Sequence, residues 1–191
     1  MAAIAGAGGE ARFARCDVTR ETEVEAAVAT ALAAFGRLDC AVNCAGVIGA
    51  SAPLHEIDLE GFFRTLAVNL TGVFLCMKHE IAAMLGRGGG AIVNVASGSG
   101  LIATPGLAPY CASKHGVLGL TKTAAVENAR TGVRVNAVCP GSIDTPMLRA
   151  SMAGIPGVEK MALAGQPGGR FGRPEEVAEA AVWLCSDRAS L

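Results

Sequence analysis

The chain has 191 residues, of which 51% are apolar and 17% charged, and its formal net charge is −1. This length and apolar content are typical of one folded domain, residues 1–191, and exclude a disordered chain. The near-zero charge argues against a nucleic-acid partner, and the absence of an uncharged apolar stretch of about 18 residues argues against a membrane span.

Four short apolar runs alternate with longer segments of helical period. We predict strands at 11–16, 38–44, 91–95 and 133–138, and helices at 22–35, about 59–85, about 110–130 and from 174 onward. Thr19 is the expected N-cap of the first helix, and Gly36 is its expected end. Strands that alternate with helices indicate an α/β fold with a parallel sheet and helices on both faces.

Seven cysteines are scattered along the chain, with no Cys-x-x-Cys pair that would indicate a zinc or thioredoxin-type site. Most lie in apolar runs, so we expect reduced, buried, structural thiols in a cytoplasmic protein. Residues 1–10 lack the basic leading segment of a signal peptide. No metal site is expected.

Small polar residues and glycines follow each predicted strand. In parallel sheets ligands bind at the carboxyl ends of the strands, and small residues let a ligand approach the backbone. The Gly- and Pro-rich segment 150–173 looks like a mobile lid with short helical pieces. Met147, Met152 and Met161, in or beside this segment, either line an apolar substrate pocket or pack in the interior, and the sequence favours neither.

Tyr110 and Lys114 are four residues apart on a predicted helix, so both side chains lie on one face. A lysine ammonium beside a phenol favours the phenolate, so we expect Lys114 to lower the pKa of Tyr110. The pair then makes a general acid/base for an alcohol or carbonyl oxygen. Spacing alone, however, favours an ordinary surface Tyr–Lys pair.

The order of motifs along the chain favours the catalytic interpretation of Tyr110 and Lys114 over the surface pair. The motifs are Asn43-Cys44-Ala45-Gly46, then Ser97 thirteen residues before Tyr110, then Tyr110-Cys111-Ala112-Ser113-Lys114, then Asn136-Ala137-Val138-Cys139-Pro140-Gly141. Together they resemble the classical short-chain dehydrogenase/reductase family, over nearly the whole chain from about Gly9 to Leu191. The resemblance implies a Rossmann-like fold and a nicotinamide-dependent oxidoreductase that acts on secondary alcohols or ketones.

The resemblance also implies roles for particular residues. The catalytic set is Tyr110 as acid/base, Lys114 as its activator and ribose ligand, Ser97 on the substrate oxygen and Asn69 on a proton-relay water. The remaining cofactor-binding residues are Asp17 and Val18 at the adenine, Asn43, Ala45 and Gly46 along the cofactor, and Pro140, Gly141, Ile143 and Thr145 at the nicotinamide. Cys44 departs from the family, where a second asparagine is more common.

The family places a strand, a Gly-rich turn and a helix before the matched region, and a last strand after it. No Gly-rich turn between a strand and a helix is found in residues 1–191, so we expect an incomplete domain, and the choice between NAD and NADP stays open. The family's sheet would then have a gap, and segment 11–16 either moves beside 38–44 or stays detached. The substrate is a small alcohol or ketone of unspecified structure.

Two functional hypotheses follow. The first is an NAD(P)-dependent oxidoreductase that forms a dimer or tetramer through the helices near 59–85 and 110–130, as the family does. The second is a truncated, non-catalytic fragment that acts, if at all, by association with full-length relatives.

Open sheet edges and apolar surface that is left uncovered each lower the free energy of unfolding, which is only a few kcal/mol for a domain. We therefore predict that the isolated 191-residue chain is marginally stable or prone to aggregate. A thermal melt followed by circular dichroism tests this, and a cooperative transition of a soluble monomer or dimer above about 37 °C would contradict it.

Overall fold

A three-stranded parallel sheet forms the centre of the protein. The computed structural model describes residues 1–154 and 157–190, and its strands lie in the order β1 (Cys40–Asn43), β2 (Gly90–Val95) and β3 (Val133–Val138). Val42 pairs with Val93 of β2, and Val93 pairs with Asn136 of β3. Three of the four predicted strands are thereby confirmed, although β1 is shorter than expected.

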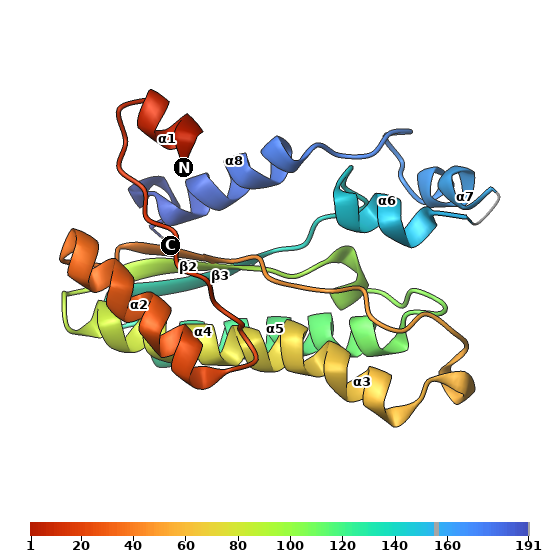
Figure 1. Cartoon of the computed structure of the whole chain (residues 1–191), viewed down its shortest axis with the longest axis horizontal. Helices are drawn as coiled ribbons and strands as arrows, with labels where there is room; N and C mark the ends of the chain where they lie inside the picture. The colour runs from red at the N-terminus through yellow and green to blue at the C-terminus, as the bar shows by residue number, and fades with distance from the viewer. Residues whose placement is uncertain (155–156, 191) are drawn as a thin grey trace.

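Helices cover both faces of this sheet (Figure 1). Helices α2, α3, α4 and α5 lie on one side, and α6, α7 and α8 lie on the other. The bounds are α1 Ala2–Gly6, α2 Glu21–Phe35, η1 Leu54–Glu56, α3 Leu59–Leu66, η2 Ala67–Thr71, α4 Gly72–Leu85, η3 Gly98–Gly100, α5 Ala108–Glu127, α6 Pro146–Met152, α7 Val158–Ala164, α8 Pro174–Cys185 and η4 Asp187–Ala189. The predicted α/β fold with helices on both faces is confirmed.

The predicted strand at 11–16 is wrong. These residues form neither helix nor strand, and the Phe13 side chain is 77% exposed. A strand requires a neighbour for its backbone hydrogen bonds, and among the described residues β1 pairs with β2 alone. Of the two alternatives for this segment, the structure has the detached one. It leaves Val42 on β1 49% exposed.

The predicted helix ends are partly right. Gly36 ends α2 in the left-handed region with φ 76°, as expected, because glycine has no Cβ to strain there. The predicted N-cap is wrong: the N-cap residue is Arg20, and the Thr19 hydroxyl instead donates to Asp17 Oδ1 at 2.8 Å. That bond folds the turn before α2 and removes Thr19 from the capping position.

The predicted helix at 59–85 is continuous but contains a π-helical segment, Ala67–Thr71, between α3 and α4. Within the described ranges, it is the helix whose length and hydropathy would suffice to cross a membrane. A helix that packs inside a soluble protein passes the same test. Glu80 near its end is buried and hydrogen-bonded to Asn43, which is the environment of a helix that packs against a sheet.

The expectation of buried cysteines is wrong. Cys40 and Cys44 are exposed, and the other five thiols are half-buried. Cys40 and Cys44 lie at the two ends of β1, where one side of the strand has no neighbour in the described chain. All seven cysteines are free thiols.

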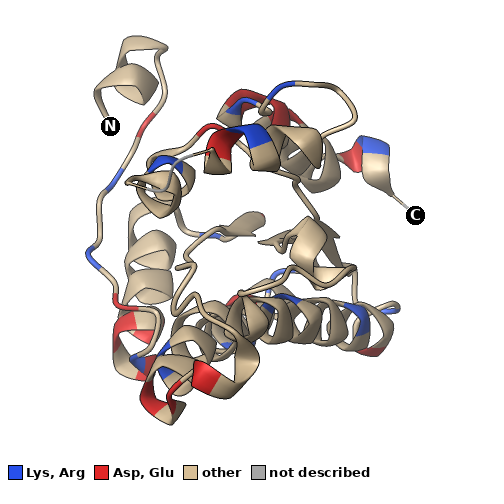
Figure 2. Cartoon of the chain, turned by 90° about the vertical axis from the view of Figure 1, so that its right-hand side faces the viewer, with Lys and Arg blue, Asp and Glu red and all other residues tan. Residues whose placement is uncertain are grey.

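Charged side chains of both signs lie on the helices. In Figure 2, blue and red ribbon occurs on the helices above and below the sheet, whereas the strands are tan over most of their length. This distribution follows from burial, because an unpaired charge in the sheet interior would carry a large desolvation cost.

A buried polar network crosses the interior beside the apolar core. The Asn43 Nδ2 group donates to Glu80 Oε2 and to Asn94 Oδ1, both at 3.0 Å. The Asn94 Nδ2 group donates to Thr121 Oγ1 at 2.9 Å and to Met77 Sδ at 3.1 Å. The network therefore joins β1 and β2 to both α4 and α5.

Burial raises the pKa of the Glu80 carboxyl, with the Asn43 hydrogen bond opposing that shift. A raised pKa in the folded state means that the folded chain binds more protons than the unfolded chain. The contribution of Glu80 to the free energy of unfolding is therefore fully present below the pKa of Glu80 in the unfolded chain. It is lost as pH rises through the higher pKa of Glu80 in the folded chain.

We predict that Glu80→Gln flattens this pH dependence and stabilises the protein at pH 7, because the amide oxygen still accepts from Asn43 and no charge is buried. Urea unfolding between pH 4 and pH 8 measures the free energy of unfolding of the variant and the wild type at each pH. Glu60→Gln, at an exposed position on α3, is the matched control and leaves the pH dependence unchanged. A steeper pH dependence in Glu80→Gln than in the wild type would contradict the prediction.

Candidate active site

Ser97, Tyr110 and Lys114 converge at the carboxyl end of β2. Ser97 lies two residues after the end of β2 and is the N-cap of the short helix η3, and its Oγ accepts from the Ser99 N–H at 3.1 Å. Tyr110 lies in the first turn of α5, where its phenol is near enough to the Ser97 side chain for Ser97 to lower the pKa of the phenol. The Lys114 Nζ lies 5.7 Å from the centre of the Tyr110 ring. The structure thus brings together three of the four predicted catalytic residues.

The pKa of Tyr110 contradicts the expectation from spacing. Burial raises the pKa of the phenol, and the hydrogen bond from Ser97 lowers it by less. Burial also lowers the pKa of Lys114, which is only 4% exposed. The Lys114 Nζ donates to the Val95 carbonyl at 2.7 Å, so its charge is directed at the end of β2 as well as towards the ring. Burial is therefore the largest cause of the pKa shift of each group in this structure.

Asn69, the fourth predicted catalytic residue, lies in the π-helical segment and is fully buried. Its amide pairs with both backbone groups of Val47: Oδ1 accepts from Val47 N, and Nδ2 donates to Val47 O, each at 2.8 Å. Nδ2 also donates to the Ser113 hydroxyl at 3.1 Å, which in turn donates to the Tyr110 carbonyl at 2.7 Å. Asn69 therefore connects the loop after β1 to the first turn of α5. Local π-helical geometry is frequent at functional sites.

Gly46 brings the loop after β1 close to the same residues. A Cβ at this position would lie 3.3 Å from Asn69 Oδ1 and 3.8 Å from Lys114 Nζ. A larger side chain here would occupy the space in front of the lysine. The structure therefore leaves backbone, rather than side chain, beside Lys114.

A pocket of about 130 Å³ opens between α4 and the end of β1. Three of the predicted cofactor residues line it, namely Val18, Asn43 and Ala45. The Asn43 amide is turned inward to Glu80 and Asn94, so it faces the buried network. Asp17 is exposed at the surface, where hydrogen bonds from Thr19 lower the pKa of its carboxyl.

A second pocket, of about 280 Å³, lies beyond the end of β3. Gly141 and Ile143 line it together with Gln166 and Arg170. Of the other two residues predicted at this place, Pro140 accepts from the Gly98 N–H at 2.8 Å and so joins the ends of β2 and β3. Thr145 caps α6, with its Oγ1 accepting from Leu148 N at 3.2 Å. Of the predicted cofactor residues, three therefore line the first pocket, and Gly141 and Ile143 line the second.

The segment 150–173 contains the end of α6 and the whole of α7, as its short helical pieces predicted, and residues 155–156 lie outside the described residues. Met161 is 76% exposed, so the interpretation of interior packing is wrong for that residue. Gly172 forms a β-bridge with Ile143, which brings the end of this segment back to the strand end.

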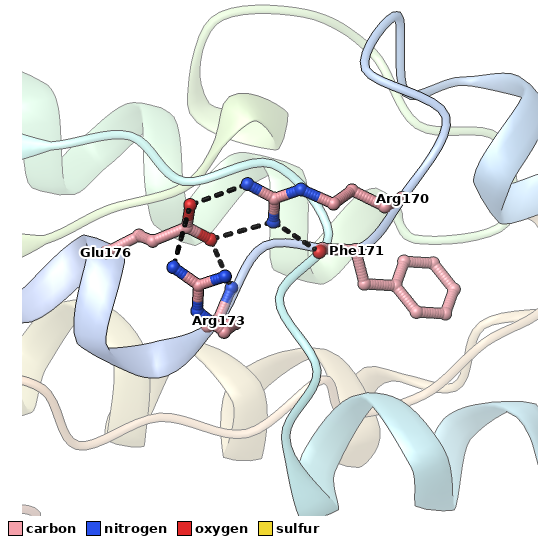
Figure 3. A network of polar contacts seen from close by, with 4 residues as sticks. All are labelled: Arg170, Phe171, Arg173 and Glu176. Carbon is pink, nitrogen blue, oxygen red and sulfur yellow. Dashed lines mark hydrogen bonds and ion pairs between the residues drawn. The ribbon is translucent and has the colours of Figure 1, made fainter.

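Glu176 holds the end of this segment through a polar network (Figure 3). The Arg170 guanidinium donates to both oxygens of Glu176, at 2.6 and 2.9 Å, and the Arg173 N–H donates to Oε2 at 2.7 Å. These hydrogen bonds lower the pKa of Glu176 to about 2, with the bond from Arg170 as the largest cause. Glu176 therefore fixes residues 170–173 against the start of α8.

Sequence reasoning missed the polar partners of these residues. They are Glu80, Asn94 and Thr121, which orient Asn43, and Glu176, which holds the segment beside Ile143. The signal for Asn94 and Glu80 was a polar residue inside an otherwise apolar strand or helix. Within the described ranges, no group of three or more His, Cys, Asp or Glu side chains is placed to hold a metal ion.

Comparison with known proteins identifies the family. A family model described as Enoyl-(Acyl carrier protein) reductase matches residues 1–191. The 2,5-dichloro-2,5-cyclohexadiene-1,4-diol dehydrogenase of Sphingobium indicum is 47% identical over 190 residues, which cover 99% of this chain and 76% of that protein. The chain belongs to the short-chain dehydrogenase/reductase family.

Two further short-chain dehydrogenase/reductase relatives agree. The cis-4-hydroxycyclohexanecarboxylate dehydrogenase of Sinomonas cyclohexanicum is 47% identical over 98% of this chain and 74% of that protein. The crystal structure of an actinorhodin polyketide ketoreductase variant with NADPH superposes with a TM-score of 0.90 and 42% identity. The matched residues cover 97% of this chain and 75% of that one. The Rossmann-like fold and the oxidoreductase class expected from the motifs are confirmed.

We predict that Glu176→Gln releases residues 165–173, because the amide accepts weaker hydrogen bonds from Arg170 and lacks the charge. The depressed pKa of Glu176 stabilises the folded state above its unfolded value near 4.5, and this contribution is lost as pH falls towards 2. Limited proteolysis at pH 7 tests the variant. Faster cleavage within 165–173 is expected, whereas Glu175→Gln, which removes the same charge one residue earlier, cleaves like the wild type. Equal rates in both variants would contradict this role.

Proposed function

We propose that this chain is an NAD(P)-dependent oxidoreductase that interconverts a secondary alcohol and a ketone, with Tyr110 as the acid/base. The observation that carries the proposal is the convergence of the Ser97 hydroxyl, the Tyr110 phenol and the buried Lys114 ammonium at the end of β2. These groups supply a hydrogen-bond donor, an exchangeable proton and a fixed positive charge. That combination is suited to a substrate oxygen whose charge changes during reaction.

Each residue has a defined task in this proposal. Ser97 holds the substrate oxygen beside the phenol. Tyr110 takes the hydroxyl proton during oxidation and returns a proton to the carbonyl oxygen during reduction. Lys114 stabilises the phenolate and bonds the ribose of the cofactor. Asn69 holds the loop after β1 through Val47 and anchors a water molecule for proton relay.

The raised pKa of Tyr110 gives the reaction a pH dependence. The phenol is protonated at neutral pH, so it is ready to act as an acid in the reductive direction. Oxidation requires the phenolate, so its rate increases as pH rises towards the pKa of Tyr110, and the reductive rate decreases over the same range. The charges of a bound cofactor also act on the pKa of Tyr110.

A nicotinamide dinucleotide, NAD or NADP, fits the residues along the strand ends. Val18, Asn43 and Ala45 would contact the adenosine half in the pocket beside α4, and Asp17 would lie at its exposed rim. Gly46 leaves backbone beside Lys114, where the nicotinamide ribose would lie. Pro140, Gly141, Ile143 and Thr145 would flank the nicotinamide. The cofactor supplies the hydride chemistry, and the protein supplies its orientation.

The names of two relatives support a proposal for the substrate class. Two of them, each 47% identical to this chain, are named for six-membered carbocyclic alcohols, a cyclohexadiene diol and a hydroxycyclohexane carboxylate. We therefore propose a small carbocyclic secondary alcohol as the substrate. Cyclohexanol is the simplest probe of this class.

We also propose that the protein is cytoplasmic and self-associates through the faces of α3, α4 and α5. Phe63, Phe74 and Val126 on these helices are 58%, 48% and 78% exposed. Exposed apolar side chains of this size favour contact with a second copy of the chain. Sedimentation velocity of the purified protein measures its oligomeric state.

We predict that Tyr110→Phe lowers the rate of cyclohexanol oxidation by about 10²–10⁴-fold, because the ring keeps its packing but loses its exchangeable proton. Cofactor reduction followed at 340 nm, with NAD and with NADP, measures turnover. Cys111→Ser, on the neighbouring residue of α5, is the matched control and retains activity. Fluorescence titration with NADH and NADPH separates binding from chemistry, and Tyr110→Phe binds like the wild type.

Equal turnover in Tyr110→Phe and the wild type would overturn the mechanism. A folded wild-type chain that binds neither NADH nor NADPH and oxidises no alcohol would overturn the proposed activity. It would favour the alternative of a non-catalytic chain that associates with relatives.

A further inference from the structure

Three residues in one row of the sheet face the end of α8. Cys40 of β1 pairs with Ala91 of β2, and Ala91 pairs with Arg134 of β3. Residues in register on parallel neighbouring strands point to the same face of a sheet. Helix α8 packs against all three strands, so this row lies beneath its last turn.

The row binds the backbone at the C-terminal end of α8. The Arg134 guanidinium donates to the Leu184 carbonyl at 2.7 Å and to the Ser186 carbonyl at 3.1 Å. Between them, the Cys185 carbonyl accepts from the Cys40 thiol, with a sulfur-to-oxygen distance of 3.6 Å. The last carbonyls of a helix have no partner within the helix, so these bonds hold the end of α8 in place.

This arrangement places the Cys40 thiol against Cys185, although the two cysteines are 145 residues apart in the chain. The Cys40 Sγ lies 3.6 Å from the Cys185 carbonyl oxygen, and the Cys40 side chain contributes to the pKa of the Cys185 thiol. Burial, with a contribution from Cys40, raises the pKa of Cys185 to about 11, so Cys185 is a protonated thiol at neutral pH. Cys40 is the exposed partner of the pair.

We propose that Cys40 and Cys185 form an oxidation site at which a peroxide converts the two thiols into an intramolecular disulfide. In the first step the exposed Cys40 sulfur attacks hydrogen peroxide, the O–O bond breaks, and Cys40 becomes a sulfenic acid with release of one water. In the second step the Cys185 sulfur attacks the Cys40 sulfur, the S–O bond breaks, and a second water leaves. Two electrons pass from the thiols to the peroxide.

The disulfide has a physical consequence for the sheet. It joins the end of α8 covalently to β1, which is an edge strand of the sheet in the described chain. Closing so long a loop restricts the unfolded chain strongly, which raises stability. The site is separate from Ser97, Tyr110 and Lys114, so the inference does not depend on the proposed catalytic activity.

Peptide mapping of the whole 191-residue chain tests the proposal. The fully reduced protein is treated with hydrogen peroxide, the reaction is stopped with catalase, remaining thiols are alkylated, and the peptides are analysed by mass spectrometry. We expect one cross-linked pair of peptides that contains Cys40 and Cys185, with the loss of two hydrogens, and reversal by dithiothreitol. The oxidised protein melts about 5–10 °C higher than the reduced protein.

Matched variants identify the pair. Cys40→Ser and Cys185→Ser abolish the cross-link and the rise in Tm, whereas Cys44→Ser, which removes the exposed thiol just after β1, retains both. Arg134→Lys keeps the charge but cannot hold two carbonyls in the same way, so the cross-link forms more slowly.

Other products would overturn the proposal, and the wild-type map is sufficient to detect them. The half-buried thiols Cys16 and Cys76 also lie near each other, and a cross-link between these two instead of Cys40 and Cys185 would contradict it. A disulfide between two chains, or irreversible oxidation of Cys40 while Cys185 remains a free thiol, would do the same.

Discussion

The site depends on how the carboxyl ends of β1 and β2 are held together in the interior. The amides of Asn43 and Asn94 lie opposite each other in the sheet register and are hydrogen-bonded, with Glu80 from α4 and Thr121 from α5 completing the network. These groups are all buried, so losing one partner would leave the others unsatisfied at a cost of about 1–3 kcal/mol each. The network fixes both strand ends relative to α4 and to α5, and α5 carries Tyr110 and Lys114.

Lys114 provides another hydrogen bond between elements, closer to Ser97 and Tyr110. Its ammonium is bonded to the last carbonyl of β2, two residues before Ser97, and lies near the Tyr110 ring. Asn69 adds a second connection, from the loop after β1 to the backbone of α5 through Ser113. Ser97, Tyr110 and Gly46 are therefore positioned by buried hydrogen bonds between elements, a rigid arrangement that suits a site in which charge moves on one oxygen atom.

The two faces of the sheet carry different parts of the structure. The face covered by α4 and α5 carries the polar network and the candidate active site. The face covered by α8 holds the Cys40, Ala91 and Arg134 row and the Glu176 network, which bind the two ends of α8. Oxidation at Cys40 and Cys185 would therefore act on the stability of α8 and β1, at a distance from the proton transfer assigned to Tyr110.

The sequence by itself determined the family, the three strands that form and the helices that cover them, because hydrophobic periodicity and the motif order are local properties of the chain. It also placed Tyr110 and Lys114 on one helix face through their spacing, and the family resemblance added Ser97 to this pair. Only the tertiary structure decided that 11–16 is not a strand, because a strand exists only with a neighbour. Burial raised the pKa of Tyr110. Contacts in the interior turned the Asn43 amide towards Glu80, and the packing of α8 on the sheet brought Cys40 to Cys185. These depend on contacts between residues far apart in the chain, which no local pattern records.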